Sequence, residues 1–146
     1  LENVDGNYYK SLKNLKILDL NGNQIFSLPE GAFENLQELI EIRLERNVLK
    51  SLPAQLFHPN RKLMTIRLNG NQIEEIPSNF FTGLAELEEI YLNNNQILIL
   101  PLNVFNDLTK LKGIYLGGNS LEVLSKEIFK FNKNLEKIDC RWNLLM

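Results

Sequence analysis

The six residues "LNGNQI" occupy positions 20–25 and return unchanged at 68–73, and the near-copy "LNNNQI" occupies 92–97. Steps of 24 residues from the second Asn of this string meet Asn each time, at Asn23, Asn47, Asn71, Asn95, Asn119 and Asn143. The same step meets only leucine at Leu15, Leu39, Leu63, Leu87, Leu111 and Leu135. A period that runs through the chain without insertion indicates a solenoid of stacked repeats.

Each repeat contains a short segment with the pattern of a strand. Leu18 and Leu20 are two residues apart, so in an extended segment both side chains point to one face. One repeat cannot bury this face alone, whereas stacked repeats form a parallel sheet over one continuous core. We expect the repeated Asn to form a structural ladder, because its amide both donates and accepts hydrogen bonds to inward-pointing backbone groups. The aromatic register Tyr9, Phe33, Phe57, Phe81, Phe105 and Phe129 is expected to fill the wider convex side.

Units such as "LKILDLNGNQIFSLPEGAFENLQE" (15–38) resemble the leucine-rich repeat, L-x-x-L-x-L-x-x-N-x-L. The "LP…F…L" pattern in the second half is most similar to the typical 24-residue class. Toll-like receptor ectodomains, small leucine-rich proteoglycans and variable lymphocyte receptors belong to that class. The resemblance implies an α/β-type repeat solenoid, a horseshoe with a concave parallel β-sheet and a convex side of irregular, 3-10 and turn structure.

We predict a single leucine-rich repeat domain over residues 1–146 with about six 24-residue repeats. The strand segments are expected near 15–23, 39–47, 63–71, 87–95, 111–119 and 135–143. The chain starts and ends in mid-repeat, and no polar cap is recognisable, so we interpret it as a portion of a longer array. A self-contained solenoid with apolar ends, prone to end-to-end association, is the alternative.

The sequence offers little for catalysis. There is one histidine, His58, and one cysteine, Cys140, which are far apart in register, so we expect no catalytic residues, no metal site and no cofactor. The net charge of −2, from 16 basic and 18 acidic residues, provides no strong field for nucleic acid. No apolar run is long enough for direct membrane insertion of this segment.

Two residues near the C-terminus depart from the repeat. Cys140 occupies the register of Leu20, so it is predicted to be buried as a small hydrophobic side chain; pairing with a cysteine of a missing cap is the alternative. Trp142 is expected at a strand end near solvent. It either packs against a following repeat or forms a binding hot spot at the rim.

Recognition is expected on the concave face, where the repeats differ most. We predict ligand-binding residues Arg43, Arg67, Glu89, Tyr91, Asn93 and Tyr115. Gly113, Gly117 and Gly118 are expected to clear space around Tyr115. Two alternatives remain: the cluster of Arg43 with Glu41, Glu45 and Asp19 neutralises itself on a solvated sheet, and Tyr91 with Tyr115 is a cross-strand stabilising pair.

The sequence therefore favours a non-enzymatic protein-binding module, a fragment of an extracellular receptor, adhesion or innate-immune protein. Its partner is expected to be a protein or another macromolecule held on the concave face, and not a nucleic acid. The alternatives are a structural spacer or homodimerisation segment, pairing through the concave face or the exposed ends, and a cytosolic scaffold. The single cysteine and the absence of an N-glycosylation sequon keep the cytosolic location open.

Overall fold

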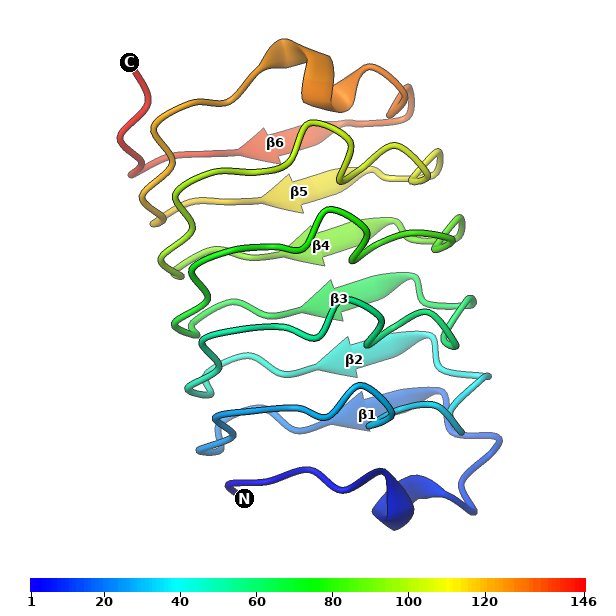
Figure 1. The fold of residues 1–146 in the computed structure, drawn as a ribbon. Helices are drawn as coiled ribbons and strands as arrows, with labels where there is room; N and C mark the ends of the chain where they lie inside the picture. Colours follow the sequence, from blue (N-terminus) through cyan, green and yellow to red (C-terminus); the bar gives the residue numbers. More distant parts are fainter.

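The computed structural model describes residues 1–146 and consists of stacked coils, each containing one short strand (Figure 1). The six strands form one sheet in the order β1-β2-β3-β4-β5-β6. They are β1 (Ile17–Asp19), β2 (Glu41–Arg43), β3 (Thr65–Arg67), β4 (Glu89–Tyr91), β5 (Gly113–Tyr115) and β6 (Lys137–Asp139). The only helices are two 3-10 helices, η1 (Gly6–Tyr9) and η2 (Lys126–Phe129). This architecture confirms the predicted repeat solenoid with a parallel sheet.

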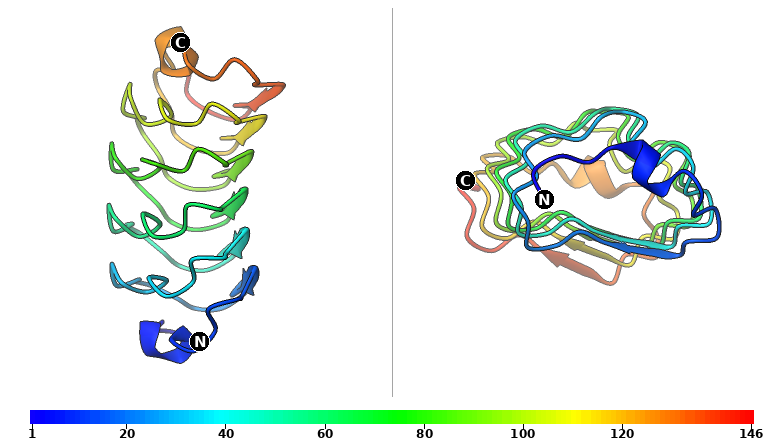
Figure 2. Two further views of the ribbon diagram at one scale, coloured as in Figure 1. Left: turned by 90° about the vertical axis from the view of Figure 1, so that its right-hand side faces the viewer. Right: turned by 90° about the horizontal axis from the view of Figure 1, so that it is seen from below.

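The strands are parallel and pair with a constant offset of 24 residues. Ile42 of β2, for example, lies between Leu18 of β1 and Ile66 of β3. Each strand has only three residues and is shorter than the segment predicted for it. The hydrogen bonds between neighbouring repeats nevertheless continue past the strand, since Gly22 N–H donates to the Glu45 carbonyl at 3.0 Å. Figure 2 shows the sheet along one side of the stack and the irregular return segments along the other.

Each coil turns sharply after its strand through a residue with left-handed backbone. The φ angle is 69° at Gly70, 56° at Arg46 and 57° at Asn94. Glycine adopts this conformation without steric cost, whereas a side chain there is disfavoured. The turn brings the following Asn under the strand and turns its side chain inward.

The inward Asn residues form the predicted ladder. Asn95 Nδ2 donates to the carbonyls of Leu68 and Leu92, both at 3.0 Å, and its Oδ1 accepts from Ile73 N–H at 3.0 Å. The amide thus bridges two repeats with three bonds in a site where it is 7% exposed. Asn47, Asn71 and Asn119 make the equivalent contacts, and the ladder supplies partners for backbone groups that water cannot reach.

The aromatic register fills the convex side, as the sequence predicts. The rings of Phe33 and Phe57 stack with centroids 6.0 Å apart, and those of Phe105 and Phe129 are 5.9 Å apart. In the middle of the array Phe80 inserts next to Phe81, with centroids 4.9 Å apart and an edge-to-face angle of 78°. All of these rings except Phe129 belong to a single core of 36 buried hydrophobic residues, and Phe129 packs against that core.

A second set of buried amides on the convex side was not predicted. Asn60 occupies a register that holds Leu in other repeats, and its Nδ2 donates to the carbonyls of Phe33 and Leu36 at 2.9 Å. Asn132 makes the same pair of bonds to Phe105 and Leu108. The Oδ1 atoms of Asn60 and Asn132 are buried without a hydrogen-bond partner. An Asn at a Leu position of the repeat is the sequence signal that could have identified this second ladder.

Candidate functional site

The outward face of the sheet carries a row of stacked side chains at the same position of three neighbouring strands, β3, β4 and β5. The Arg67 guanidinium lies over the Tyr91 ring, 4.4 Å from its centroid. The rings of Tyr91 and Tyr115 are parallel, with centroids 4.4 Å apart and an interplanar angle of 1°. Lys137 Nζ is 5.2 Å from the Tyr115 centroid and extends the row onto β6. The 24-residue register brings these side chains together, since it aligns Arg67, Tyr91 and Tyr115 across the strands.

The N-terminal end of the row is fixed by a shared carboxylate. Glu41 accepts a hydrogen bond from Arg43 Nε at 2.9 Å and another from Arg67 Nε at 2.8 Å. Arg43 also reaches Asp19 at 3.2 Å. The hydrogen bond from Arg43 is the main reason why the pKa of Glu41 lies below its ordinary value, with the bond from Arg67 adding to it against the effect of burial. The charges of Asp19 and Glu41 are therefore compensated by those of Arg43 and Arg67 on the sheet.

Only some of the charged residues expected to cluster with Arg43 form ion pairs with it. Glu41 and Asp19 pair with Arg43, whereas Glu45 forms no ion pair with it. One carboxylate oxygen of Glu45 is buried and has no hydrogen-bond partner. Arg67 is held by Glu41 on one side and by the Tyr91 face on the other, so its guanidinium is positioned before any ligand arrives.

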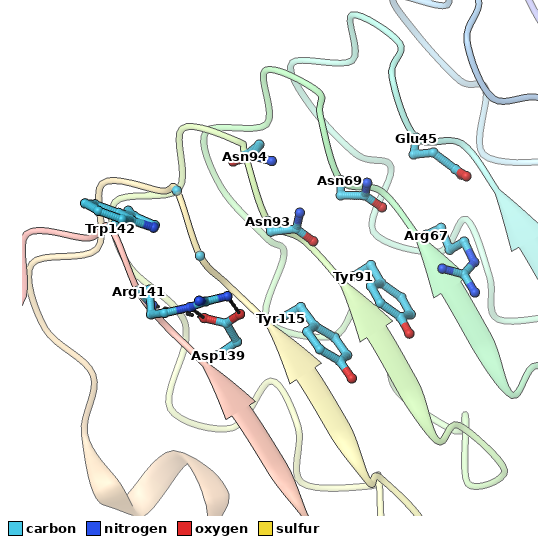
Figure 3. Close-up of a pocket in the computed structure, with 12 residues that line it drawn as sticks. Glu45, Arg67, Asn69, Tyr91, Asn93, Asn94, Tyr115, Asp139, Arg141 and Trp142 are labelled. Carbon is cyan, nitrogen blue, oxygen red and sulfur yellow. Dashed lines mark hydrogen bonds and ion pairs between the residues drawn. The ribbon is translucent and has the colours of Figure 1, made fainter.

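The row borders a hollow of about 440 Å³ at the strand ends (Figure 3). Gly117 adds no side chain to its floor, whereas the space over Gly118 is occupied by the Asn94 amide, which a Cβ atom there would overlap. Asn69 and Asn93 line one side, and neither amide bonds to another lining residue in Figure 3. The hollow is lined by Glu45, Arg67, Asn69, Tyr91, Asn93, Asn94, Tyr115, Gly117, Gly118, Asp139, Arg141 and Trp142. It offers flat aromatic surface, amide donors and acceptors, and charges of both signs, which suits recognition rather than bond chemistry.

Glu89 lies on the same face of the sheet as the row, in register with Thr65 and Gly113. Its carboxylate lies over Gly113, where a Cβ atom would overlap it, so this glycine makes room for Glu89 and not only for Tyr115. One oxygen of Glu89 is buried there without a hydrogen-bond partner. Burial raises the pKa of the Tyr115 hydroxyl, and the negative charge of Glu89 raises it further.

The structure gathers four of the six predicted binding residues around the hollow, namely Arg67, Tyr91, Asn93 and Tyr115. Arg43 and Glu89 lie on the same face outside its lining. Asp139 and Arg141, which pair with each other at 2.8 Å on the far wall, were not predicted as binding residues. The available signal was the 24-residue register, which places Asp139 after Tyr115 and Arg141 after Gly117. Trp142 is 84% exposed at the rim.

Reactive side chains do not converge elsewhere in the chain. Cys140 directly follows β6. It was predicted to be buried but is only half-buried, because β6 has a neighbouring strand on one side only. His58 lies on the convex side, with Nε2 3.1 Å from the Asn79 carbonyl oxygen. No group of three or more His, Cys, Asp or Glu side chains is placed to hold a metal ion. The structure also has no helix with the length and apolar character that crossing a membrane requires.

Comparison with solved structures finds the same fold in other proteins. In the complex of TLR13 with ssRNA13, a chain 32% identical in sequence superposes with a TM-score of 0.93 over 99% of this chain and 20% of that one. In the Toll–Spatzle complex from Drosophila, in its glycosylated form, the values are 21% identity, a TM-score of 0.92, and 98% and 21% coverage. The leucine-rich repeat domain of APL1B gives 23% identity and 0.85 over 95% of this chain and 42% of that one.

The chain therefore spans about a fifth of the Toll and TLR13 chains, and at their lower identities Toll and APL1B show likeness of fold alone. No curated protein matches the sequence. A family model, "Leucine rich repeat", matches residues 13–73 and 61–121, which together cover most of the chain. With the 24-residue register, the Asn ladder and this match, the chain belongs to the leucine-rich repeat family.

Proposed function

We propose that this chain is a non-enzymatic binding module that holds a protein on its concave sheet face, centred on Arg67, Tyr91 and Tyr115. The observation that carries the proposal is the continuous stack of these three side chains at the edge of an open hollow. Tyr and Arg dominate the energetics of protein interfaces because they combine large contact area with hydrogen-bonding groups. The fold itself does not require them, since their side chains point away from the core.

Preorganisation supports this assignment. Arg67 is already held by Glu41 at 2.8 Å and by the Tyr91 ring, and the two tyrosines hold each other in parallel. A ligand that docks here does not have to order these side chains, each of which would otherwise cost about 0.5–1.5 kcal/mol of side-chain entropy. The sheet beneath these side chains is also ordered before binding, so its backbone adds no ordering cost.

The charge of the face supports a protein ligand in preference to a nucleic acid. The outward strand positions carry carboxylates at Asp19, Glu41, Glu45, Glu89 and Asp139, and cations at Arg43, Arg67, Lys137 and Arg141. Binding to phosphate backbones depends on a surplus of Lys and Arg, and this face has none. TLR13 is in complex with an RNA in its structure and Toll with Spatzle, so neighbours of this fold bind different classes of macromolecule.

We place the module outside the cell, in a receptor, adhesion or innate-immune protein, on the likeness to the Toll and TLR13 chains. Antibody staining of the full-length parent protein on intact and permeabilised cells tests this location. Signal confined to permeabilised cells would favour the cytosolic scaffold.

The binding test begins with capture of partners from the parent's native fluid on immobilised protein, followed by titration of the captured protein. Tyr91→Ala and Tyr115→Ala are each expected to weaken binding by about 1 kcal/mol or more, or at least about fivefold. Tyr8→Ala is the matched control, because Tyr8 is 65% exposed but lies in η1, away from the sheet face. Unchanged affinity in both sheet variants would move the site elsewhere.

The same variants distinguish binding from a purely structural role. If Tyr91 and Tyr115 serve only as a cross-strand pair in a spacer array, their loss lowers the melting temperature and leaves partner affinity intact. For a binding row, the affinity changes while the melting temperature changes little.

A further inference from the structure

A patch of exposed aliphatic side chains lies outside the sheet-face hollow, where the chain leaves two strand-end turns and begins its return. We define this flank patch as Leu98, Ile99, Leu102 and Val123, whose exposed fractions are 55, 66, 63 and 65%. They belong to two consecutive repeats, and Glu122 N–H donates to the Leu98 carbonyl at 3.4 Å, so the two segments lie side by side. Single exposed apolar residues are ordinary on a protein surface, but four adjacent ones are not.

The fold does not require apolar residues at these positions. The preceding repeat has Glu74, Glu75 and Ser78 in the same registers as Leu98, Ile99 and Leu102, and these residues are exposed as well. The core is supplied instead by the neighbouring Leu100, which is 6% exposed. Replacing carboxylates by branched aliphatic side chains in one repeat therefore adds nothing to the core and exposes hydrocarbon to water.

The patch surrounds a small groove rather than a flat area. Ile99, Leu102 and Val123 form its walls, and Leu100, Leu124 and Ile128 form its floor. Its volume of about 100 Å³ suits one aliphatic side chain of a partner. None of these residues lines the hollow on the sheet face, so the groove is a separate site.

Four exposed carboxylates lie next to the groove. Glu74 and Glu75 belong to the repeat before it, whereas Glu122 and Glu127 directly precede the lining residues Val123 and Ile128. None takes part in any of the ion pairs of the structure, although Glu38, Glu86 and Glu88 pair with lysines elsewhere on the surface. Two exposed lysines lie nearby, Lys50 beside Glu74 and Lys126 in the register of Leu102, and neither forms an ion pair. With four carboxylates against two lysines, the rim has a net negative charge.

We infer that the flank patch binds a basic amphipathic segment of another protein, with one aliphatic side chain in the groove and Lys or Arg side chains against the acidic rim. A second copy of this chain does not suit the patch, because a two-fold contact would place the same carboxylates opposite one another. The module thereby has two surfaces, one on the sheet and one on the flank, which can hold two different partners at once.

The test uses a short fluorescent peptide of alternating Leu and Lys as the probe, with fluorescence anisotropy on the folded 146-residue chain. Ile99→Ser combined with Val123→Ser is expected to weaken binding at least about tenfold, the scale of an interface hot spot. Phe26→Ser is the matched control, since Phe26 is 53% exposed in the same register as Leu98 but three repeats away. Tyr115→Ala, on the sheet face, is expected to leave probe binding unchanged.

A separate variant tests the contribution of the acidic rim. Glu74→Gln, Glu75→Gln and Glu122→Gln together are expected to weaken probe binding and to reduce its dependence on salt. A peptide of alternating Leu and Glu should not bind. Failure of the Leu-Lys peptide to bind, an equal loss in Phe26→Ser, or equal binding of the Leu-Glu peptide would each overturn the inference. So would concentration-dependent dimerisation in sedimentation that Ile99→Ser abolishes.

Discussion

The rings of Tyr91 and Tyr115 lie parallel, 4.4 Å apart between centroids, on the outward face of adjacent strands. The two hydroxyls point in the same direction, as Figure 3 shows, and the parallel contact makes the two side chains one stacked unit. Arg67 stacks on one end of it and Lys137 approaches the other. The row is therefore a composite of four repeats, and no single repeat contains it.

The pKa of the Tyr115 hydroxyl depends on its burial and on the neighbouring charges. Burial raises the pKa of its hydroxyl, and the charge of Glu89 adds to the rise. We expect Glu89→Gln to lower the pKa of Tyr115 toward the ordinary tyrosine value of about 10, because the neighbouring negative charge is gone. NMR titration of ring-labelled tyrosine measures it. Glu88→Gln is the control, since Glu88 pairs with Lys112 at 2.9 Å; an equal effect of both changes would contradict a specific role of Glu89.

The shared carboxylate of Glu41 makes stability depend on pH. Its pKa is depressed in the folded protein, so its contribution is fully present above the unfolded value of about 4.3 and is lost as pH falls through the lower folded value. We expect Glu41→Gln to cost about 1 kcal/mol of unfolding free energy at pH 7. The difference from the wild type should shrink toward zero at acid pH.

Urea unfolding at neutral and acid pH measures this difference. Glu38→Gln is the control, because Glu38 forms an exposed pair with Lys62 only and bridges no two arginines. A difference between wild type and Glu41→Gln that stays constant with pH would show that the carboxylate is not the group responsible.

We expect the loss of an Asn from the first ladder to cost more unfolding free energy than the loss of an Asn from the second ladder. Asn95→Leu leaves the Ile73 N–H without its acceptor in the core and should cost at least about 3 kcal/mol. Asn60→Leu should cost less than about 1 kcal/mol. The carbonyls of Phe33 and Leu36 keep the bonds from Leu36 and Leu39 N–H, and the unpartnered Oδ1 of Asn60 disappears. Chemical denaturation of both variants tests the order, and equal costs would contradict it.

The left-handed turn accounts for one glycine of the repeated string. Gly70 has a φ of 69°, and Gly70→Ala should destabilise the protein by about 1–2 kcal/mol through backbone strain alone, since its Cβ would meet only ordinary contacts at 3.5 Å. Gly31→Ala is the control, because Gly31 does not have a left-handed backbone and its Cβ would meet the end of the Glu34 side chain at 3.4 Å. Equal melting temperatures of the two variants would exclude strain as the cause.

The sequence by itself determined the solenoid. A 24-residue period that keeps Leu, Asn and Phe in register requires stacked strands, an inward Asn ladder and an aromatic convex side, because these side chains cannot be buried in any other common register. The alignment of Arg67, Tyr91 and Tyr115 followed from the same count, since a constant period makes neighbours of residues 24 apart.

Only the tertiary structure decided which neighbours interact. Register places Glu41 beside Thr65 and Arg43 beside Arg67, yet the Glu41 carboxylate reaches diagonally to Arg67 because the long arginine side chain bends back across the sheet. The register of Cys140 predicts a buried side chain. Its partial exposure cannot be predicted from the register, because exposure depends on how many strands flank β6. The hollow and the flank patch likewise depend on side chains from several repeats. A repeat pattern fixes backbone spacing, whereas rotamers and the number of packed neighbours decide contacts and exposure.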